Sequence, residues 1–249
     1  MSSLVSIITP SYNSSKFIKD CVASVFSQTY KNWEMIIVDD CSKDNSKEII
    51  SELSTKDKRI KPIFLKKNVG AAEARNTAIR QSKGKYVAFL DSDDLWNPKK
   101  LEKQLSFMNE NEIAFSYTTY QFMSEGGEDL SNIISAPEKM TYHSYLKNTI
   151  IGCLTVIIDR EKSGEFEMPN IRSSHDMALW LLIMKRGFSA YGLDENLAKY
   201  RVVSSSNTSN KLKAAKEVWY VYRIVEKLSV FYALICFVGY ALNAIRKRI

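Results

Sequence analysis

Apolar segments of strand length alternate with segments of helical periodicity through the first hundred residues, and this alternation is what most constrains the fold. The apolar segments are 4–9, 34–39, 60–65 and 85–90. Apolar spacings of three and four predict helices that begin near Ser14 or Ser15, within 42–53, within 69–84 and after Asn97. Parallel strands need long crossover connections, which helices commonly supply. We therefore predict an α/β fold with a doubly wound, mostly parallel central sheet and helices on both faces.

The second half of the chain is less regular. The elements predicted there are strands over 113–122 and 154–158, a surface loop over 124–132, and a buried helix over 175–187. A polar run over 204–210 predicts a flexible connection. We divide the chain into one domain over 1–210, with halves of about 1–110 and 111–210, and a helical tail over 211–249.

Polar side chains directly follow three of the predicted strands. The segments are TPSYN over 9–13, Asp39-Asp40, and Asp91-Ser92-Asp93-Asp94. The carboxyl ends of parallel strands meet at one edge of a sheet, where α/β proteins bind their ligands. We therefore expect the three loops to form one site. A solvated acidic loop is the alternative for the last segment, but its position after a buried strand favours a binding site.

Glycine-dependent nucleotide motifs are absent from the sequence. TPSYN contains no glycine, and the chain has no GxxxxGK[ST] segment, which argues against a dinucleotide fingerprint and a P-loop. Carboxylates that hold a metal are another way to neutralise phosphate charge. Mg²⁺ and Mn²⁺ prefer oxygen ligands and take one or two carboxylates together with substrate phosphates. We predict Mn²⁺ or Mg²⁺ as the cofactor.

The net charge of +7 is concentrated in the tail. Residues 211–249 carry eight Lys and Arg and two Glu, a net of +6, which leaves +1 for residues 1–210. A nucleic-acid-binding domain would carry its own basic face, so we expect no nucleic acid partner. Two histidines and four widely spaced cysteines argue against a zinc site. Without a recognisable signal peptide, the cysteines are expected to be free thiols in the cytoplasm.

Four ordered motifs resemble those of family 2 glycosyltransferases, the large inverting group with the GT-A fold. They are VSIITPSYN, IIVDDCSKDNS, NVGAAEARNTAI and YVAFLDSDDLWNPKKLEKQ, which together cover about residues 4–104. Weaker similarity continues through FEMPNIRSSHDMALWLLIMKRG and YRVVSSSNTSNK. The resemblance is greatest to bacterial enzymes that build O-antigen or capsule repeat units. It implies inverting transfer of a sugar from a nucleotide donor, expected to be a UDP-sugar, to a lipid-linked saccharide.

The resemblance assigns a donor site residue by residue. Pro10 and Tyr12 would line the pocket of the base, and Asp40 would accept a hydrogen bond from it. Arg75 would reach the base or the diphosphate. The nucleotide-sugar-binding set expected is Thr9, Pro10, Tyr12, Asp40, Arg75, Asp91, Ser92 and Asp93. From the residues alone, the alternatives are an N-cap on the following helix for Asp40, rim packing for Tyr12 and a surface charge for Arg75.

The same resemblance divides the acidic loop between three roles. Asp93 would bind the metal directly, and Asp91 would lie near the ribose and the metal. Asp94 is expected to cap a helix or to support the ligands. This arrangement suits the chemistry, because a divalent cation stabilises the charge that develops on a leaving nucleoside diphosphate.

Asp176 is the expected catalytic base. Inverting transfer needs a base that deprotonates the acceptor hydroxyl. Relatives commonly place a Glu-Asp pair before a helix, whereas this chain has His175-Asp176. Amide dipoles at the start of a helix favour an ionised Asp176. Helix capping is the alternative for Asp176, and Trp180 is expected in the core.

The tail contains an uncharged run over 228–245, followed by Arg246-Lys247-Arg248. As a helix this run spans about 27 Å at ~1.5 Å per residue, slightly less than a hydrocarbon core of ~30 Å. Small or polar residues recur at spacings of three and four, at Ser229, Ala233, Cys236, Tyr240 and Asn243. The pattern favours a helix in the membrane interface, with basic ends toward anionic lipid. A short span and a helix packed in a core or oligomer are the alternatives.

The tail and the resemblance together predict peripheral attachment to the inner face of the cell membrane. The expected acceptor is a saccharide carried by a polyprenyl diphosphate. Two other functions are considered. One is a membrane-attached nucleotide-sugar-binding protein without transferase activity, which would not need Asp176. The other is a DxD phosphohydrolase, whose acidic pair follows the first strand rather than the fourth.

Overall fold

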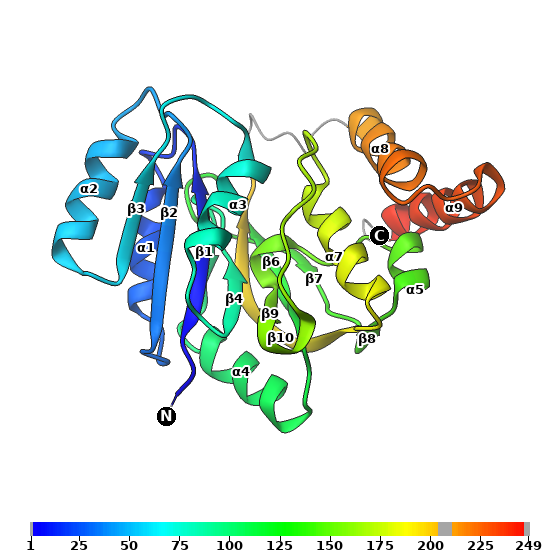
Figure 1. Ribbon diagram of the computed structural model, residues 1–249, viewed down its shortest axis with the longest axis horizontal. Coiled ribbons are helices and arrows are strands. Elements are labelled where there is room, and N and C mark those ends of the chain that lie inside the picture. The colour runs from blue at the N-terminus through cyan, green and yellow to red at the C-terminus, as the bar shows by residue number, and fades with distance from the viewer. Residues whose placement is uncertain (1, 204–210, 247–249) are drawn as a thin grey trace.

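The computed structural model describes residues 2–203 and 211–246, which are built around a single ten-stranded sheet (Figure 1). Its N-terminal strands are β1 (Val5–Ser11), β2 (Trp33–Asp39), β3 (Ile60–Phe64) and β4 (Tyr86–Phe89). They lie in the order β3-β2-β1-β4, and each neighbouring pair is parallel. The crossover helices are α1 (Ile18–Phe26), α2 (Ser46–Lys56) and α3 (Ala71–Gln81). The predicted alternation of strands and helices is confirmed in this half.

Strands after β4 add antiparallel pairs, so the sheet is mixed although its longest pairings are parallel. These strands are β5 (Leu95–Trp96), β6 (Phe115–Met123), β7 (Asp129–Ile134), β8 (Lys139–Met140), β9 (Ile157–Asp159) and β10 (Ala190–Arg201). β9 lies between β4 and β6 and is antiparallel to both, while β10 is parallel to β6. Strand direction was not readable from the apolar pattern, because a strand buried on both faces has the same composition in either orientation.

Four strands lie where the sequence predicted none: the two-residue strands β5 and β8, and the longer β7 and β10. Residues 129–132, expected in a surface loop, belong to β7, whose side chains are mostly exposed and therefore lack an apolar pattern. β10 carries charged residues at Asp194 and Glu195 and has register shifts against β6 in that region. Irregular pairing and the polar stretch together hide the alternation by which a strand is normally recognised.

Helices cover both faces of the sheet. The remaining helices of the body are α4 (Lys100–Glu110), α5 (Tyr142–Lys147), η1 (Cys153–Thr155), α6 (Arg160–Ser163) and α7 (His175–Lys185). Val5 and Ile7 of β1 join a core cluster with α1, α2 and α4, whereas Ile8 joins another with α3 and α7. Trp180 of α7 is fully buried, with its ring 5.4 Å from that of Phe89, as expected for a core residue.

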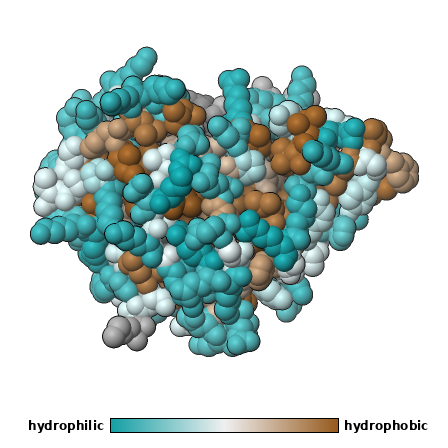
Figure 2. Space-filling model, in the orientation of Figure 1, coloured by the Kyte–Doolittle hydropathy of each residue, from teal (hydrophilic) through white to brown (hydrophobic). Residues whose placement is uncertain are grey.

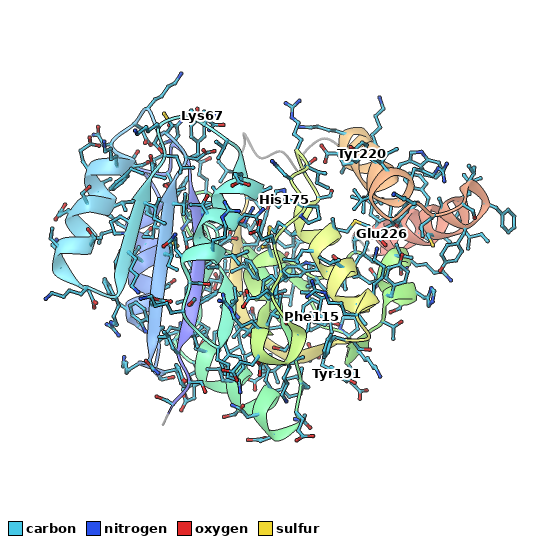
Figure 3. All side chains as sticks on the ribbon, in the orientation of Figure 1. Lys67, Phe115, His175, Tyr191, Tyr220 and Glu226 are labelled. Carbon is cyan, nitrogen blue, oxygen red and sulfur yellow. The ribbon has the colours of Figure 1, made fainter. Side chains whose placement is uncertain are left out.

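The tail forms a helical hairpin at the end of the molecule opposite α2 (Figure 1). It consists of α8 (Lys211–Tyr220), the π-helical turn η3 (Val221–Val225) and α9 (Val230–Arg246). The buried carboxylate of Glu226, labelled in Figure 3, accepts a hydrogen bond of 2.6 Å from Tyr142 of α5. It also pairs with Lys185 of α7 at 3.0 Å. The hairpin is thus anchored to the body by the buried Glu226 carboxylate, which has both a hydrogen-bond donor and a cation as partners.

The small-residue stripe of α9 faces the protein. Ala233 and Cys236 are fully buried, and Asn243 donates a hydrogen bond of 3.0 Å to the carbonyl of Lys147 in α5. Gly239 permits this close approach, since a Cβ there would lie 2.9 Å from the Cβ of Lys147. The stripe is therefore an intramolecular packing surface, which short side chains favour because they let two helices approach closely.

The opposite face of α9 is apolar and exposed. Its exposed side chains are Val230, Phe231, Leu234, Ile235, Val238 and Leu242. Figure 2 shows hydrophobic side chains gathered at this end of the molecule. Among the described helices, none is long and apolar enough to cross a membrane. The predicted flexible run 204–210 and the basic residues Lys247 and Arg248 lie outside the described residues.

Candidate active site

A cleft of about 620 Å³ opens between the two halves of the body. Six of the residues predicted for the site line it, namely Tyr12, Arg75, Asp91, Ser92, Asp93 and Asp176. Tyr12 follows β1 and the acidic loop follows β4, so two of the three strand-end loops meet there. Arg75 comes from α3 and Asp176 from α7. The fold therefore brings residues far apart in the sequence to one cleft.

Thr9, Pro10 and Asp40 are not among the described residues that line this cleft. Thr9 is fully buried within β1. Asp40 is also buried, and its two carboxylate oxygens accept the backbone N–H groups of Val69 at 2.7 Å and Gly70 at 2.8 Å. Gly70 is the N-cap residue of α3. Asp40 thus fixes the N-terminal end of α3, whereas the helix that directly follows Asp40 in the sequence is α2.

The acidic loop after β4 holds its three carboxylates in different surroundings. Asp91 forms an ion pair with Arg75. Burial and the charge of Asp91 raise the pKa of Asp93 to about 6. Asp94 is buried and accepts a hydrogen bond of 2.9 Å from the backbone N–H of Arg201, while burial raises its pKa well above the usual range. Asp94 therefore supports the loop, whereas Asp93 forms no ion pair with the residues that the structure describes.

Arg201 is a structural residue of the site that sequence reasoning missed. It lies at the end of β10, is 3% exposed, and its Nε donates a hydrogen bond of 2.7 Å to the carbonyl of Asp93. Its guanidinium lies 4.9 Å from the ring centroid of Phe17. In the sequence, Arg201 is marked only by being the one arginine in the segment YRVVSSSNTSNK. Arg201 connects β10 to the acidic loop and so holds two distant segments in register.

His175 and Arg75 link α7 to α3 at the centre of the molecule, where Figure 3 labels His175. Nη1 of Arg75 donates to Nε2 of His175 at 2.7 Å, while its Nη2 contacts Asp91. Burial, followed by the charge of Arg75, lowers the pKa of His175. A neutral His175 can accept this hydrogen bond, so Arg75 is held between an imidazole and a carboxylate.

Asp176 occupies the first turn of α7 and is half-buried at the cleft. The preceding Ser174 has a positive φ of 55°, which turns the chain into the helix and aims its first turn at the cleft. Oδ1 of Asp176 accepts the backbone N–H of Met177 at 2.8 Å. Asp176 is therefore accessible from the cleft.

The cleft suits a divalent cation that shares its ligands with a substrate. Within residues 2–203 and 211–246, no group of three or more His, Cys, Asp and Glu side chains could hold a metal alone. Asp93 and Asp91 offer carboxylate oxygens in one loop, and burial together with the charge of Asp91 raises the pKa of Asp93. Mg²⁺ and Mn²⁺ accept such partial sites and complete their coordination with phosphate oxygens and water.

Comparison with known families identifies the family of the chain. The sequence profile described as Glycosyl transferase family 2 matches residues 6–162. The chain belongs to this family. As a family 2 glycosyltransferase it is an enzyme, which confirms the predicted class and excludes the phosphohydrolase alternative. The acidic loop indeed follows the fourth strand rather than the first.

Two bacterial glycosyltransferases are among the proteins to which this chain is similar in sequence. The chain is 54% identical over 246 residues to TuaG of Bacillus subtilis (strain 168), named for teichuronic acid biosynthesis, with 99% of this chain and 98% of TuaG covered. It is 43% identical over 217 residues to WfgD of Escherichia coli, covering 87% of this chain and 84% of WfgD. WfgD is named a UDP-Glc:α-D-GlcNAc-diphosphoundecaprenol β-1,3-glucosyltransferase.

Solved structures share the fold of this glycosyltransferase at low sequence identity. TarS 1-349 of S. aureus in complex with UDP has a TM-score of 0.70 at 21% identity, with 96% of this chain and 70% of that chain covered. The mannosyltransferase PcManGT of Pyrobaculum calidifontis, in complex with GDP-Man and Mn²⁺, has a TM-score of 0.72 at 15% identity. That match covers 99% of this chain and 71% of PcManGT. The predicted GT-A fold is thereby confirmed.

Proposed function

We propose that this glycosyltransferase transfers a sugar from a UDP-sugar to a saccharide linked to a polyprenyl diphosphate, with inversion, in bacterial surface polysaccharide synthesis. One observation carries the proposal: a single cleft contains the carboxylates of Asp91 and Asp93 and the candidate base Asp176. The similarity to WfgD, whose name specifies UDP-Glc and a diphosphoundecaprenol-linked GlcNAc, supports both substrate classes.

In this proposal the half over 1–110 binds the donor. Tyr12 is 47% exposed beside the acidic loop, which suits a ring that packs on a base. Asp40 contributes to donor binding by holding the backbone at Val69 and Gly70. Its carboxylate oxygens also keep lone pairs that can accept a further hydrogen bond. Asp93 and Asp91 would hold Mn²⁺ or Mg²⁺, which when bound stabilises the charge of the departing diphosphate.

The half over 111–210 supplies the acceptor side. Asp176 removes the proton of the attacking hydroxyl, and the first-turn amides stabilise its carboxylate before that transfer. Arg75, held by His175 and Asp91, keeps a positive charge at the cleft beside the donor loop. Inversion follows from attack on the face of the donor sugar opposite the leaving diphosphate.

A donor screen tests the proposed function. The purified full chain is incubated with Mn²⁺, individual UDP-sugars or GDP-mannose, and a synthetic α-GlcNAc diphosphate that carries a long alkyl chain. We expect one UDP-sugar to give a glycosylated product with the opposite anomeric configuration, measured by mass spectrometry and NMR. Transfer from GDP-mannose alone, or retention of configuration, would contradict the proposal.

We further propose that the exposed face of α9 rests on the inner surface of the cell membrane. The face is apolar, and Lys216 and Lys227 of the same hairpin are exposed. Apolar side chains enter the acyl boundary while lysines interact with anionic headgroups. Such attachment would bring the cleft close to a lipid-linked acceptor.

The double variant Leu234→Asp, Val238→Asp is expected to lose most binding to vesicles that contain phosphatidylglycerol. Both side chains are exposed, at 49% and 58%, so the variant should fold. Two charges on the apolar face oppose its entry into lipid. Co-sedimentation with the vesicles measures the effect. The matched variant Ser51→Asp, Thr55→Asp on α2 adds equal charge at the same spacing and should still bind; equal binding by both would refute the attachment.

A further inference from the structure

An uncharged groove of about 550 Å³ lies beside the catalytic cleft. We call it the side groove. Its described lining combines aromatic and aliphatic side chains with two neutral polar ones, Asn132 and Thr149; the apolar and aromatic residues include Tyr120, Phe122, Ile133, Ile134, Val202 and Tyr240. None of the described residues that line it carries a charge. A groove without charged side chains suits a hydrocarbon ligand rather than a phosphate, a sugar acid or a charged peptide.

The side groove adjoins the cleft at an aromatic cluster. Tyr120 lines both hollows, and its ring centroid lies 5.6 Å from that of Phe122 in the groove. Tyr200, which lines the cleft, lies 5.4 Å from Phe122 and 6.4 Å from Tyr120. A ligand that occupies both hollows would therefore contact these three rings.

The outer wall of the side groove belongs to the helix with the exposed apolar face. Tyr240 and Ala244 of α9 line the groove, while Leu242 between them is 54% exposed. The helix α9 therefore contributes both to the wall of the groove and to the surface that we assign to the membrane.

We propose that the side groove holds the first isoprenoid units of the acceptor lipid. The inference rests on the proposed lipid-linked acceptor and specifies where its lipid binds. The acceptor saccharide lies in the cleft near Asp176, and its diphosphate stays with the cleft, whose lining includes Arg75 and Arg172. The uncharged groove receives the hydrocarbon, because burial of apolar surface is favourable there and a charged group would lose its hydration.

Two acceptors and two groove variants test the proposal. The acceptors are α-GlcNAc diphosphate esterified with a farnesyl chain and the same compound with a methyl group. The wild-type enzyme is expected to show a lower KM for the farnesyl acceptor. Ile133→Asp and Val202→Asp, at side chains 51% and 44% exposed, should raise that KM by about tenfold or more, since each sets a charge against the hydrocarbon. The KM for the methyl acceptor should be unchanged.

Ile224→Asp is the matched control. Ile224 is 56% exposed on η3 and is not among the described residues that line the side groove. This variant should retain the wild-type preference for the farnesyl acceptor. An equal rise in KM for both acceptors, or no rise in either groove variant, would overturn the proposal.

A binding measurement separates the groove from the proposed function. A benzophenone-bearing farnesyl diphosphate analogue is photo-crosslinked to the full chain, and labelled peptides are mapped by mass spectrometry. Labelling within 120–134 or 240–244, lost in Ile133→Asp, supports the groove even if no tested sugar is transferred. Absence of such labelling, despite transfer to the farnesyl acceptor, refutes the groove alone. A dimer that dissociates in Ile133→Asp would assign the groove to a second copy and would also refute the proposal.

Discussion

Asp93→Asn is expected to abolish metal-dependent use of the donor. Asp93 lines the cleft within the acidic loop, where burial and the neighbouring charge of Asp91 raise its pKa. The amide keeps the size of the side chain but removes the charge that would hold the cation. Metal stabilisation of the leaving group is worth several kcal/mol, so turnover should fall by about 100-fold or more. Calorimetric titration with UDP, with and without Mn²⁺, and the rate of transfer measure the loss.

Asp94→Asn is the matched control in the same loop. Asp94 is buried, and it accepts the backbone N–H of Arg201, which an amide oxygen can also do. Its raised pKa further reduces the difference between the acid and an amide. This variant should keep the Mn²⁺ dependence of UDP binding. If Asp93→Asn binds UDP with unchanged Mn²⁺ dependence, Asp93 is not a metal ligand.

Asp176→Asn is expected to lower kcat by about 10²–10⁴-fold while leaving UDP affinity intact, because general base catalysis contributes a factor of that size. Asp176 lines the cleft from the first turn of α7, and the donor loop is on other elements. Loss of the base should therefore affect the chemical step and spare donor binding. Single-turnover rates with saturating donor and acceptor, together with UDP titration, distinguish the two effects.

His175→Gln provides the comparison for Asp176→Asn. Glutamine retains an oxygen that can accept from Nη1 of Arg75, the contact that His175 makes at 2.7 Å. We expect a much smaller loss of kcat than for Asp176→Asn, and an unchanged fold by circular dichroism. Near-normal turnover in Asp176→Asn would mean that another group acts as the base, and a larger loss in His175→Gln would point to His175 itself.

Much of the donor side was predictable because its signals are local. Strand periodicity placed the loops after β1, β2 and β4, and parallel strands bring those ends to one edge of the sheet. The cleft contains Tyr12, Asp91 and Asp93 from these loops as expected. Asp40 differs, since its carboxylate is occupied by the backbone at Val69 and Gly70. A side chain's neighbours thirty residues away are not visible in its own segment.

The acceptor side was less predictable because its signals depend on contacts between distant segments. β10 has charged residues and register shifts, so its pattern does not resemble a strand. Arg201 becomes informative only where β10 meets the acidic loop. The stripe in α9 was interpreted as one face of an interfacial helix, but short side chains equally suit close packing, and here they contact the body.

The alternation of elements, the glycosyltransferase family and the position of the acidic loop could be predicted without coordinates, because short-range periodicity and motif spacing record them. Three other features became visible only in the folded chain: β9 runs antiparallel to both of its neighbours, Arg75 joins His175 to Asp91, and the side groove meets the cleft at Tyr120. Each of these depends on pairings across the chain. Their stability comes from burial and hydrogen bonding that exist only after folding.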